Sequence, residues 1–147
     1  GLIIACGTLL GAALEAAAQL AGEGLEVAVI NARFVKPLDT DLLLPRIDAA
    51  PWVVTVEENA LPTGFGSAVL EALNDAHATS GLPAGPLVRL GLPDRFVEHG
   101  ERGELLAELG LDAAGIAAAC RRLAGRSPAA VATTPPVAEH AAHTARS

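Results

Sequence analysis

Short apolar runs alternate with longer segments of helical periodicity along the first 125 residues. The apolar runs cover Leu2 to Cys6, Val27 to Ile30, Trp52 to Val56 and Leu87 to Leu90, and we expect each to form a strand. None of them alternates apolar with polar positions, which is typical of strands covered on both faces of a sheet. Strands that alternate with helices favour parallel pairing through right-handed crossovers. The pattern predicts an α/β fold, a three-layer α/β/α domain with a mostly parallel sheet over residues 1–125.

Helical segments fill the intervals between these runs. Leu10 to Ala21 repeats apolar residues at helical spacing, with Thr8 as the expected cap and Gly22 to Gly24 as the stop signal. Asp39 is expected to cap a short helix that Pro45 limits or kinks. Further helices are expected over Ser67 to Ala78, Glu101 to Leu109 and Asp112 to Leu123, with Asp112 as the cap of the last.

The segment 126–147 has a different composition. Pro, Ala, Thr and Ser dominate it and it lacks periodicity, so we predict a disordered tail. The whole chain carries 17 acidic and 10 basic residues, a formal net charge of -7. Only one acid and two bases lie in the tail, so the predicted domain carries 16 acids and 8 bases. This acidity argues against nucleic acid as a partner.

The chain contains no methionine and opens directly on an apolar run, so we expect a fragment of a longer protein. No basic segment precedes that run, as a secretory signal would require. No apolar stretch is both long enough and free enough of glycine and charge to span a membrane. Cys6 and Cys120 lie in apolar surroundings, which fits small core residues in a reducing compartment. We therefore expect a cytoplasmic protein with no membrane partner.

Two adjacent carboxylates follow the third apolar run. Ligand sites of parallel sheets form beyond the carboxyl ends of strands, so the loop from Glu57 to Gly66 is a candidate site. Glu57 and Glu58 could serve as an acid and a base, or bind a metal ion. Neighbouring residues of an extended chain point to opposite sides, however, so they would not readily share one ligand. The pattern favours one glutamate buried against a partner and the other solvated.

The same loop contains Asn59 and a pair of glycines, Gly64 and Gly66, just before a predicted helix. Such a pair could form a phosphate cradle at the helix N-terminus. The full dinucleotide fingerprint and the P-loop lysine are both missing, and the chain has a single lysine, Lys36. Close backbone packing or a turn is therefore the favoured interpretation.

A second polar loop, from Gly91 to Gly100, contains Asp94, Arg95 and His99. A histidine beside a carboxylate is the arrangement that proton transfer needs. The loop has no serine or cysteine nucleophile nearby, and Arg95 could equally pair with an acid of a neighbouring subunit. We favour a structural or interface role for this loop.

Five strings, in matching order, resemble the C-terminal domain of the 1-deoxy-D-xylulose-5-phosphate synthases, a thiamine-diphosphate family of the transketolase superfamily. They are Gly7-Thr8-Leu9, NARFVKPLD at 31–39, VTVEENALPTGFGSAVLEAL at 54–73, GLPDRFVEHG at 91–100 and LLAELGLDAAGI at 105–116. Together they cover most of residues 1–120. Asn31 stands where an acidic residue is expected, and none of the strings matches the two N-terminal domains of the family.

The resemblance implies a part in condensing pyruvate with D-glyceraldehyde 3-phosphate, with loss of carbon dioxide, at the entry to non-mevalonate isoprenoid synthesis and to thiamine and pyridoxal synthesis. Thiamine diphosphate and magnesium would lie between the two N-terminal domains, and this third domain would support a homodimer and bind no cofactor itself. The resemblance therefore implies no catalytic residue here and an inert isolated chain. Residues expected to face the other domains, the active site or the dimer partner are Arg33, Glu57, Glu58, Asn59, Gly64, Gly66, Asp94, Arg95 and His99.

Two alternatives remain. Transketolase and the β subunit of 2-oxo-acid dehydrogenase E1 components end in similar domains, although the strings at 91–100 and 105–116 favour the synthases. The chain could also be a free-standing assembly module without chemistry.

Overall fold

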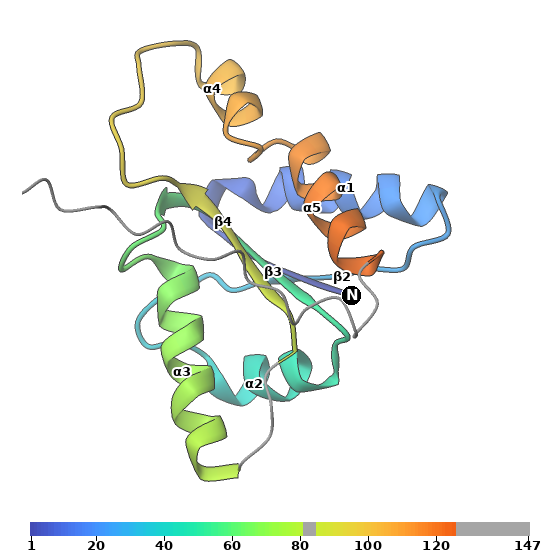
Figure 1. The fold of residues 1–147 in the computed structure, drawn as a ribbon, viewed down its shortest axis with the longest axis vertical. Coiled ribbons are helices and arrows are strands. Elements are labelled where there is room, and N and C mark those ends of the chain that lie inside the picture. The colour runs from blue at the N-terminus through green and yellow to red at the C-terminus, as the bar shows by residue number, and fades with distance from the viewer. Residues whose placement is uncertain (81–84, 126–147) are drawn as a thin grey trace, which may run out of the picture.

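Four strands form one parallel sheet in a computed structural model that describes residues 1–80 and 85–125. The strands are β1 (Leu2–Cys6), β2 (Ala28–Asn31), β3 (Val53–Ala60) and β4 (Leu87–Leu92), in the order β2-β1-β3-β4 (Figure 1). The helices are the 3-10 turn η1 (Gly7–Leu9), α1 (Leu10–Gly22), α2 (Thr40–Ala49), α3 (Phe65–Ser80), α4 (Arg102–Glu108) and α5 (Ala113–Ala124). The tail predicted over 126–147 lies outside the described residues.

The helices cover both faces of the sheet, so the predicted three-layer α/β/α fold is confirmed. Alternate residues of one strand serve the two faces, as Ile3 packs with α1 and α5 whereas Ile4 packs with α2 and α3. Figure 1 shows the two helix pairs on opposite sides of the strands. Both cores consist mainly of aliphatic side chains, with Trp52 in one and Phe65 in the other.

Two strands are longer than the sequence pattern predicts. β3 continues through Glu57, Glu58 and Asn59 to Ala60, so the expected loop from Glu57 begins four residues too early. Parallel pairing with β4 extends the strand, because Ala60 pairs with Leu92 beyond an irregularity that follows Val56. β4 accordingly continues past Leu90 through Gly91 to Leu92. β2 is shifted by one residue and ends at Asn31.

Capping signals were informative where the cap is local. The side chains of Asp39 and Asp112 accept backbone N–H groups of Leu42 and Gly115, as expected. The expectation that Thr8 caps a helix is wrong. Thr8 lies inside the turn η1, and its hydroxyl donates to Glu58 on β3. Helix α2 also runs past Pro45, which was expected to limit or kink it.

Both cysteines are free, and burial affects their acidity. Cys120 is fully buried in α5, and loss of solvation raises the pKa of its thiol to about 11. Cys6 is only partly buried at the end of β1, so it is less enclosed than a core residue. Burial, followed by the nearby charge of Glu57, raises the pKa of the Cys6 thiol.

Within the described residues, no helix is long and apolar enough to cross a membrane.

Candidate site at the carboxyl edge of the sheet

Glu57 is a buried carboxylate that caps a helix from outside. Its side chain points toward α3, and the residue is only 2% exposed. One carboxylate oxygen accepts the N–H of Phe65 at 2.6 Å, and the other accepts the N–H of Gly66 at 2.8 Å. These amides belong to the first turn of α3, which has no intrahelical partners for them. The negative charge also lies at the positive end of the helix dipole.

The two glycines allow this close approach. A side chain at Gly64 would collide with the Glu57 carboxylate and the carbonyl oxygen of Ala60. A Cβ at Gly66 would lie 2.7 Å from Thr55 Oγ1. The glycine pair therefore allows close packing, as favoured above. The backbone N–H groups that a phosphate would need already donate to Glu57, so the interpretation as a phosphate cradle is wrong.

The side chain of Arg89, on β4, binds the turn that connects β3 to α3. Its guanidinium Nη1 donates to the carbonyl oxygen of Leu61 at 2.9 Å and to Ser67 Oγ at 2.8 Å. The Ser67 hydroxyl donates in turn to the same carbonyl oxygen. This small network fixes the turn that brings the N-terminus of α3 onto Glu57.

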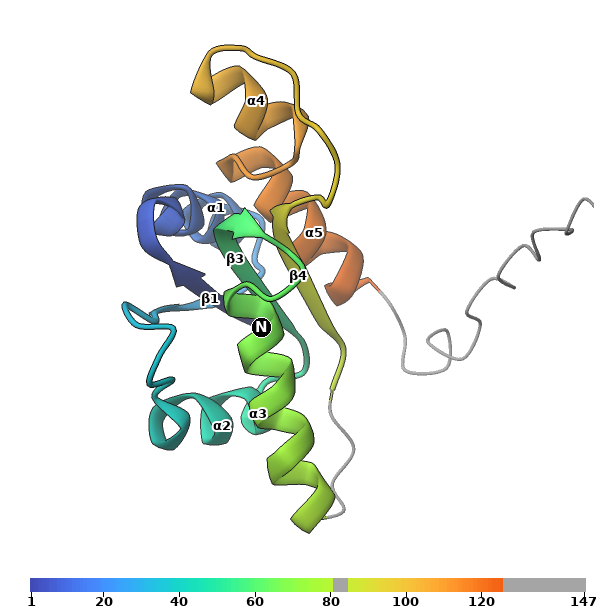
Figure 2. The same cartoon turned by 90° about the vertical axis from the view of Figure 1, so that its left-hand side faces the viewer.

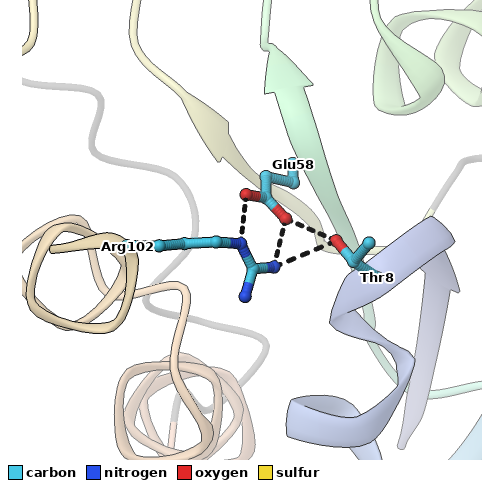
Figure 3. Close-up of polar contacts among 3 residues, drawn as sticks. All are labelled: Thr8, Glu58 and Arg102. Carbon is cyan, nitrogen blue, oxygen red and sulfur yellow. Dashed lines mark hydrogen bonds and ion pairs between the residues drawn. The ribbon is translucent and has the colours of Figure 1, made fainter.

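Glu58 points to the other side of β3, as the alternation of an extended strand requires. Its oxygens accept hydrogen bonds from Arg102 Nε at 2.8 Å and Arg102 Nη2 at 2.5 Å, and from the Thr8 hydroxyl (Figure 3). Arg102 Nη2 also donates to Thr8 Oγ1 at 3.2 Å. The prediction of one buried glutamate is correct for Glu57. Glu58 keeps contact with solvent, with 29% of its side chain exposed, but it is also paired with Arg102, which the prediction did not include.

The cluster Thr8–Glu58–Arg102 joins η1, β3 and α4, which are far apart in sequence (Figure 3). Hydrogen bonds from Arg102 and then from Thr8 hold the pKa of the Glu58 carboxyl below its ordinary value. The same bond with Glu58 raises the pKa of Arg102. A two-point contact between a guanidinium and a carboxylate fixes orientation as well as charge. The cluster thus attaches the exposed helix α4 to the sheet.

The remaining predicted residues lie on the surface of this edge. Arg33 is exposed in the loop after β2 with φ 53°, and its N–H donates to Asn31 Oδ1 at 3.3 Å. The Asn59 side chain accepts the N–H of Ala60 at 2.8 Å. Asp94, Arg95 and His99 are exposed in the segment after β4. Within the described part of the chain, His99 has no hydrogen bond to a carboxylate. The structure therefore does not contain the histidine–carboxylate pair that was considered for proton transfer.

Glu58 and Arg102 line two hollows on this edge. One, of about 530 Å³, lies over the ends of β1 and β3. It is lined by Cys6, Gly7, Thr8, Val35, Glu57, Glu58, Asn59, Phe65 and Arg102. The other, of about 340 Å³, lies between the segment after β4 and α4. It is lined by Glu58, Leu92, Val97, Glu98, His99, Gly100, Arg102, Leu105, Leu106 and Leu109.

Comparison with known proteins places this architecture in a family. The family described as "Transketolase, C-terminal domain" matches residues 2–116. The chain belongs to the transketolase C-terminal domain family. A solved structure titled "Split gene transketolase, inactive beta4 tetramer" is similar to this transketolase C-terminal domain, with a TM-score of 0.72 and 35% identity over 83% of this chain and 38% of that one.

Curated relatives refine the resemblance. Over 125 residues the chain is 50% identical to 1-deoxy-D-xylulose-5-phosphate synthase 2 of Geobacter sulfurreducens, covering 85% of this chain and 19% of the relative. It is 54% identical over 117 residues to synthase 1 of the same organism, covering 80% and 18%. It is 53% identical over 116 residues to the synthase of Synechococcus sp. (strain JA-2-3B'a(2-13)), covering 79% and 17%. The chain spans about a fifth of the length of these relatives.

The residues described here do not fit a resident thiamine diphosphate or magnesium ion. In residues 1–80 and 85–125, no three His, Cys, Asp or Glu side chains are arranged to hold a metal ion. The amides at the start of α3, which could receive a phosphate, are bonded to Glu57. This transketolase C-terminal domain therefore presents no donor set for the cofactor within the described residues.

Sequence reasoning missed three residues of the edge. Thr8 was read as a helix cap, and Arg102 and Arg89 were not singled out at all. Arg102 lies 44 positions from Glu58, and a contact over that separation leaves no local pattern. The available signal was the topology, because parallel strands place their carboxyl ends, and hence Thr8 and Glu58, side by side.

Proposed function

We propose that this chain is the C-terminal domain of a 1-deoxy-D-xylulose-5-phosphate synthase. Identity near 50% to such synthases, over most of this chain, is the observation that carries the proposal. The whole enzyme would condense pyruvate with D-glyceraldehyde 3-phosphate and release carbon dioxide. Its thiamine diphosphate and magnesium would be held by other domains of the protein.

The domain would contribute assembly, and the chemistry would take place elsewhere. Glu57 caps α3 and Glu58 is bonded to Arg102 of α4, and these structural roles of the two carboxylates support the proposal. The surface residues Arg33, Asp94, Arg95 and His99 would face the other domains or the partner subunit. A homodimer also agrees with the solved neighbour, whose title describes a tetramer of a single kind of chain.

An assay of the purified chain tests this division of labour. The full chain is incubated with pyruvate, D-glyceraldehyde 3-phosphate, thiamine diphosphate and magnesium, beside the Geobacter sulfurreducens synthase as a positive control. We expect no 1-deoxy-D-xylulose 5-phosphate above the protein-free blank. Product formation by the chain alone would show that it contains an active site, and the proposal would be wrong.

A further inference from the structure

Helix α4 is held to the domain by few contacts, and none of its residues is buried. Figure 2 shows it standing away from the sheet, at the end of the segment that rises from β4 and turns over. Of the ion pairs found within residues 1–80 and 85–125, the one between Arg102 and Glu58 is the only one that involves α4. The leucines of the helix, Leu105 and Leu106, are only partly buried. An element with few buried apolar contacts opens at a lower free energy than the whole domain unfolds.

Two glycines bracket this helix. Gly100 lies two residues before the first residue of α4, and Gly110 lies two residues after the last. Gly110 has φ 69°, in the left-handed region that favours glycine. A few residues at the ends of an element can absorb the change of backbone angles when that element moves as a unit. Helix α4 therefore has a possible hinge at each end.

The ion pair of α4 stands between the two hollows described above. Glu58 and Arg102 are the residues that the lining of the 530 Å³ hollow shares with the lining of the 340 Å³ hollow in the described part of the chain. Figure 3 shows the guanidinium meeting the carboxylate, with Thr8 beside both. The pair is thus part of the wall that separates the hollows. If Arg102 moved away with α4, the two hollows would become continuous.

The pair is strong enough to orient α4 and weak enough to open. Its two-point geometry selects one position of the guanidinium on the carboxylate. The Arg102 side chain is nevertheless 59% exposed, and exposed pairs contribute little free energy and are weakened by salt. A closed form that such a pair favours leaves an open form accessible at low cost.

We propose that α4 is a latched lid. It moves as a unit about Gly100 and Gly110, and the hydrogen bonds from Arg102 to Glu58 and Thr8 hold it closed. In the closed form the two hollows are separate, and in the open form they are a single, larger one. The lid is a property of this chain alone, so it can fail while the proposed function stands.

The thiol of Cys6 reports on the lid in the full chain. Cys6 lines the larger hollow and is partly exposed, whereas Cys120 is fully buried. N-(1-pyrenyl)maleimide is bulky, N-methylmaleimide is small, and both are uncharged. Each adds a thiolate to the same double bond, so the ratio of their rates cancels the acidity of the thiol and measures access. Cys6→Ser should abolish the signal and so assign it to this residue.

Loss of the latch should favour the bulky reagent. Arg102→Ala should raise the ratio of the pyrenyl rate to the methyl rate at least about threefold, because the open form becomes more populated. Arg102→Lys keeps the charge without the two-point contact and should give an intermediate ratio. Sodium chloride at about 1 M should raise the ratio in the unaltered chain and leave it unchanged in Arg102→Ala.

A matched control removes the same kind of pair elsewhere. Arg121 makes a two-point contact with Glu23 between α5 and the end of α1, and both side chains are exposed. Arg121→Ala should therefore leave the ratio as it is in the unaltered chain. An unchanged ratio in a folded Arg102→Ala variant would overturn the lid. An equal rise in Arg121→Ala would also overturn it, because loss of any surface pair would then loosen the domain.

Discussion

Two adjacent glutamates divide the carboxyl edge into two regions of different character. The Glu57 carboxylate is buried between β3 and the start of α3, and both of its oxygens accept N–H groups from the first turn of that helix. Around Glu58 the pairing is exposed and reaches across the chain to Arg102 on a helix with no buried residue. One glutamate belongs to the folding core, and the other connects that core to a surface element.

This difference shows what an adjacent carboxylate pair means at the end of a strand. Alternation along β3 separates the two side chains, so the pair serves two neighbours and cannot converge on one ligand. The two glutamates also contribute unequally to the free energy of unfolding. Loss of the buried acceptor Glu57 leaves unpaired donors, whereas the exposed ion pair of Glu58 contributes little to global stability. Changes at the two positions should therefore have separable effects.

The largest effect is expected at Glu57. Glu57→Ala would leave the N–H groups of Phe65 and Gly66 buried without an acceptor, which costs about 3 kcal/mol. Urea unfolding followed by circular dichroism measures this loss. Glu57→Gln keeps one acceptor oxygen and should lose less. If Glu57→Ala unfolds at the same urea concentration as the unaltered chain, the buried region does not depend on this cap.

A gain of stability is expected next to it. The Thr55 hydroxyl is fully buried, and within the described residues it has no hydrogen-bond partner. Thr55→Val removes this unpaired group and should raise the free energy of unfolding by about 1 kcal/mol. The same urea titration measures it, with Thr55→Ser as a control that keeps the hydroxyl. A loss of stability in Thr55→Val would mean that the hydroxyl has a partner.

A local effect without a large global one is expected at Arg102. Arg102→Ala removes both hydrogen bonds to Glu58, so amide hydrogen exchange in residues 101–109 should become faster while α3 exchanges as before. Arg102→Lys keeps the charge without the two-point contact and should give an intermediate rate. Unchanged exchange in α4 would show that its leucines alone hold it in place.

Acid should release the same attachment in the unaltered chain. The hydrogen bonds hold the pKa of Glu58 below the ordinary value of 4.5, so the paired carboxylate stabilises the folded form. This contribution is fully present above pH 4.5 and is lost as the pH falls through the lowered pKa. Exchange of α4, corrected for its intrinsic pH dependence, should accelerate over that range, and Glu58→Gln should abolish the change.

The sequence was sufficient for the layers of the fold and for caps that act over three residues. Continuous apolar runs identified the strands, and Asp39 and Asp112 marked the starts of their helices. The sequence was insufficient where partners are remote, as for Thr8 and Arg102, because no periodicity connects positions 94 residues apart. It also placed the end of β3 too early, since polar residues such as Glu57 and Glu58 continue the strand only through pairing with β4.

The central claim is that this chain is the C-terminal domain of a 1-deoxy-D-xylulose-5-phosphate synthase, and a domain replacement tests it most directly. Residues 1–125 replace the matching C-terminal segment of synthase 2 of Geobacter sulfurreducens, and product formation is measured beside the same synthase truncated before that segment. We expect the chimera to regain at least about a tenth of the parent kcat/KM while the truncated enzyme stays far lower, a loss of no more than about 1.4 kcal/mol. A folded chimera as inactive as the truncated enzyme would contradict the assignment.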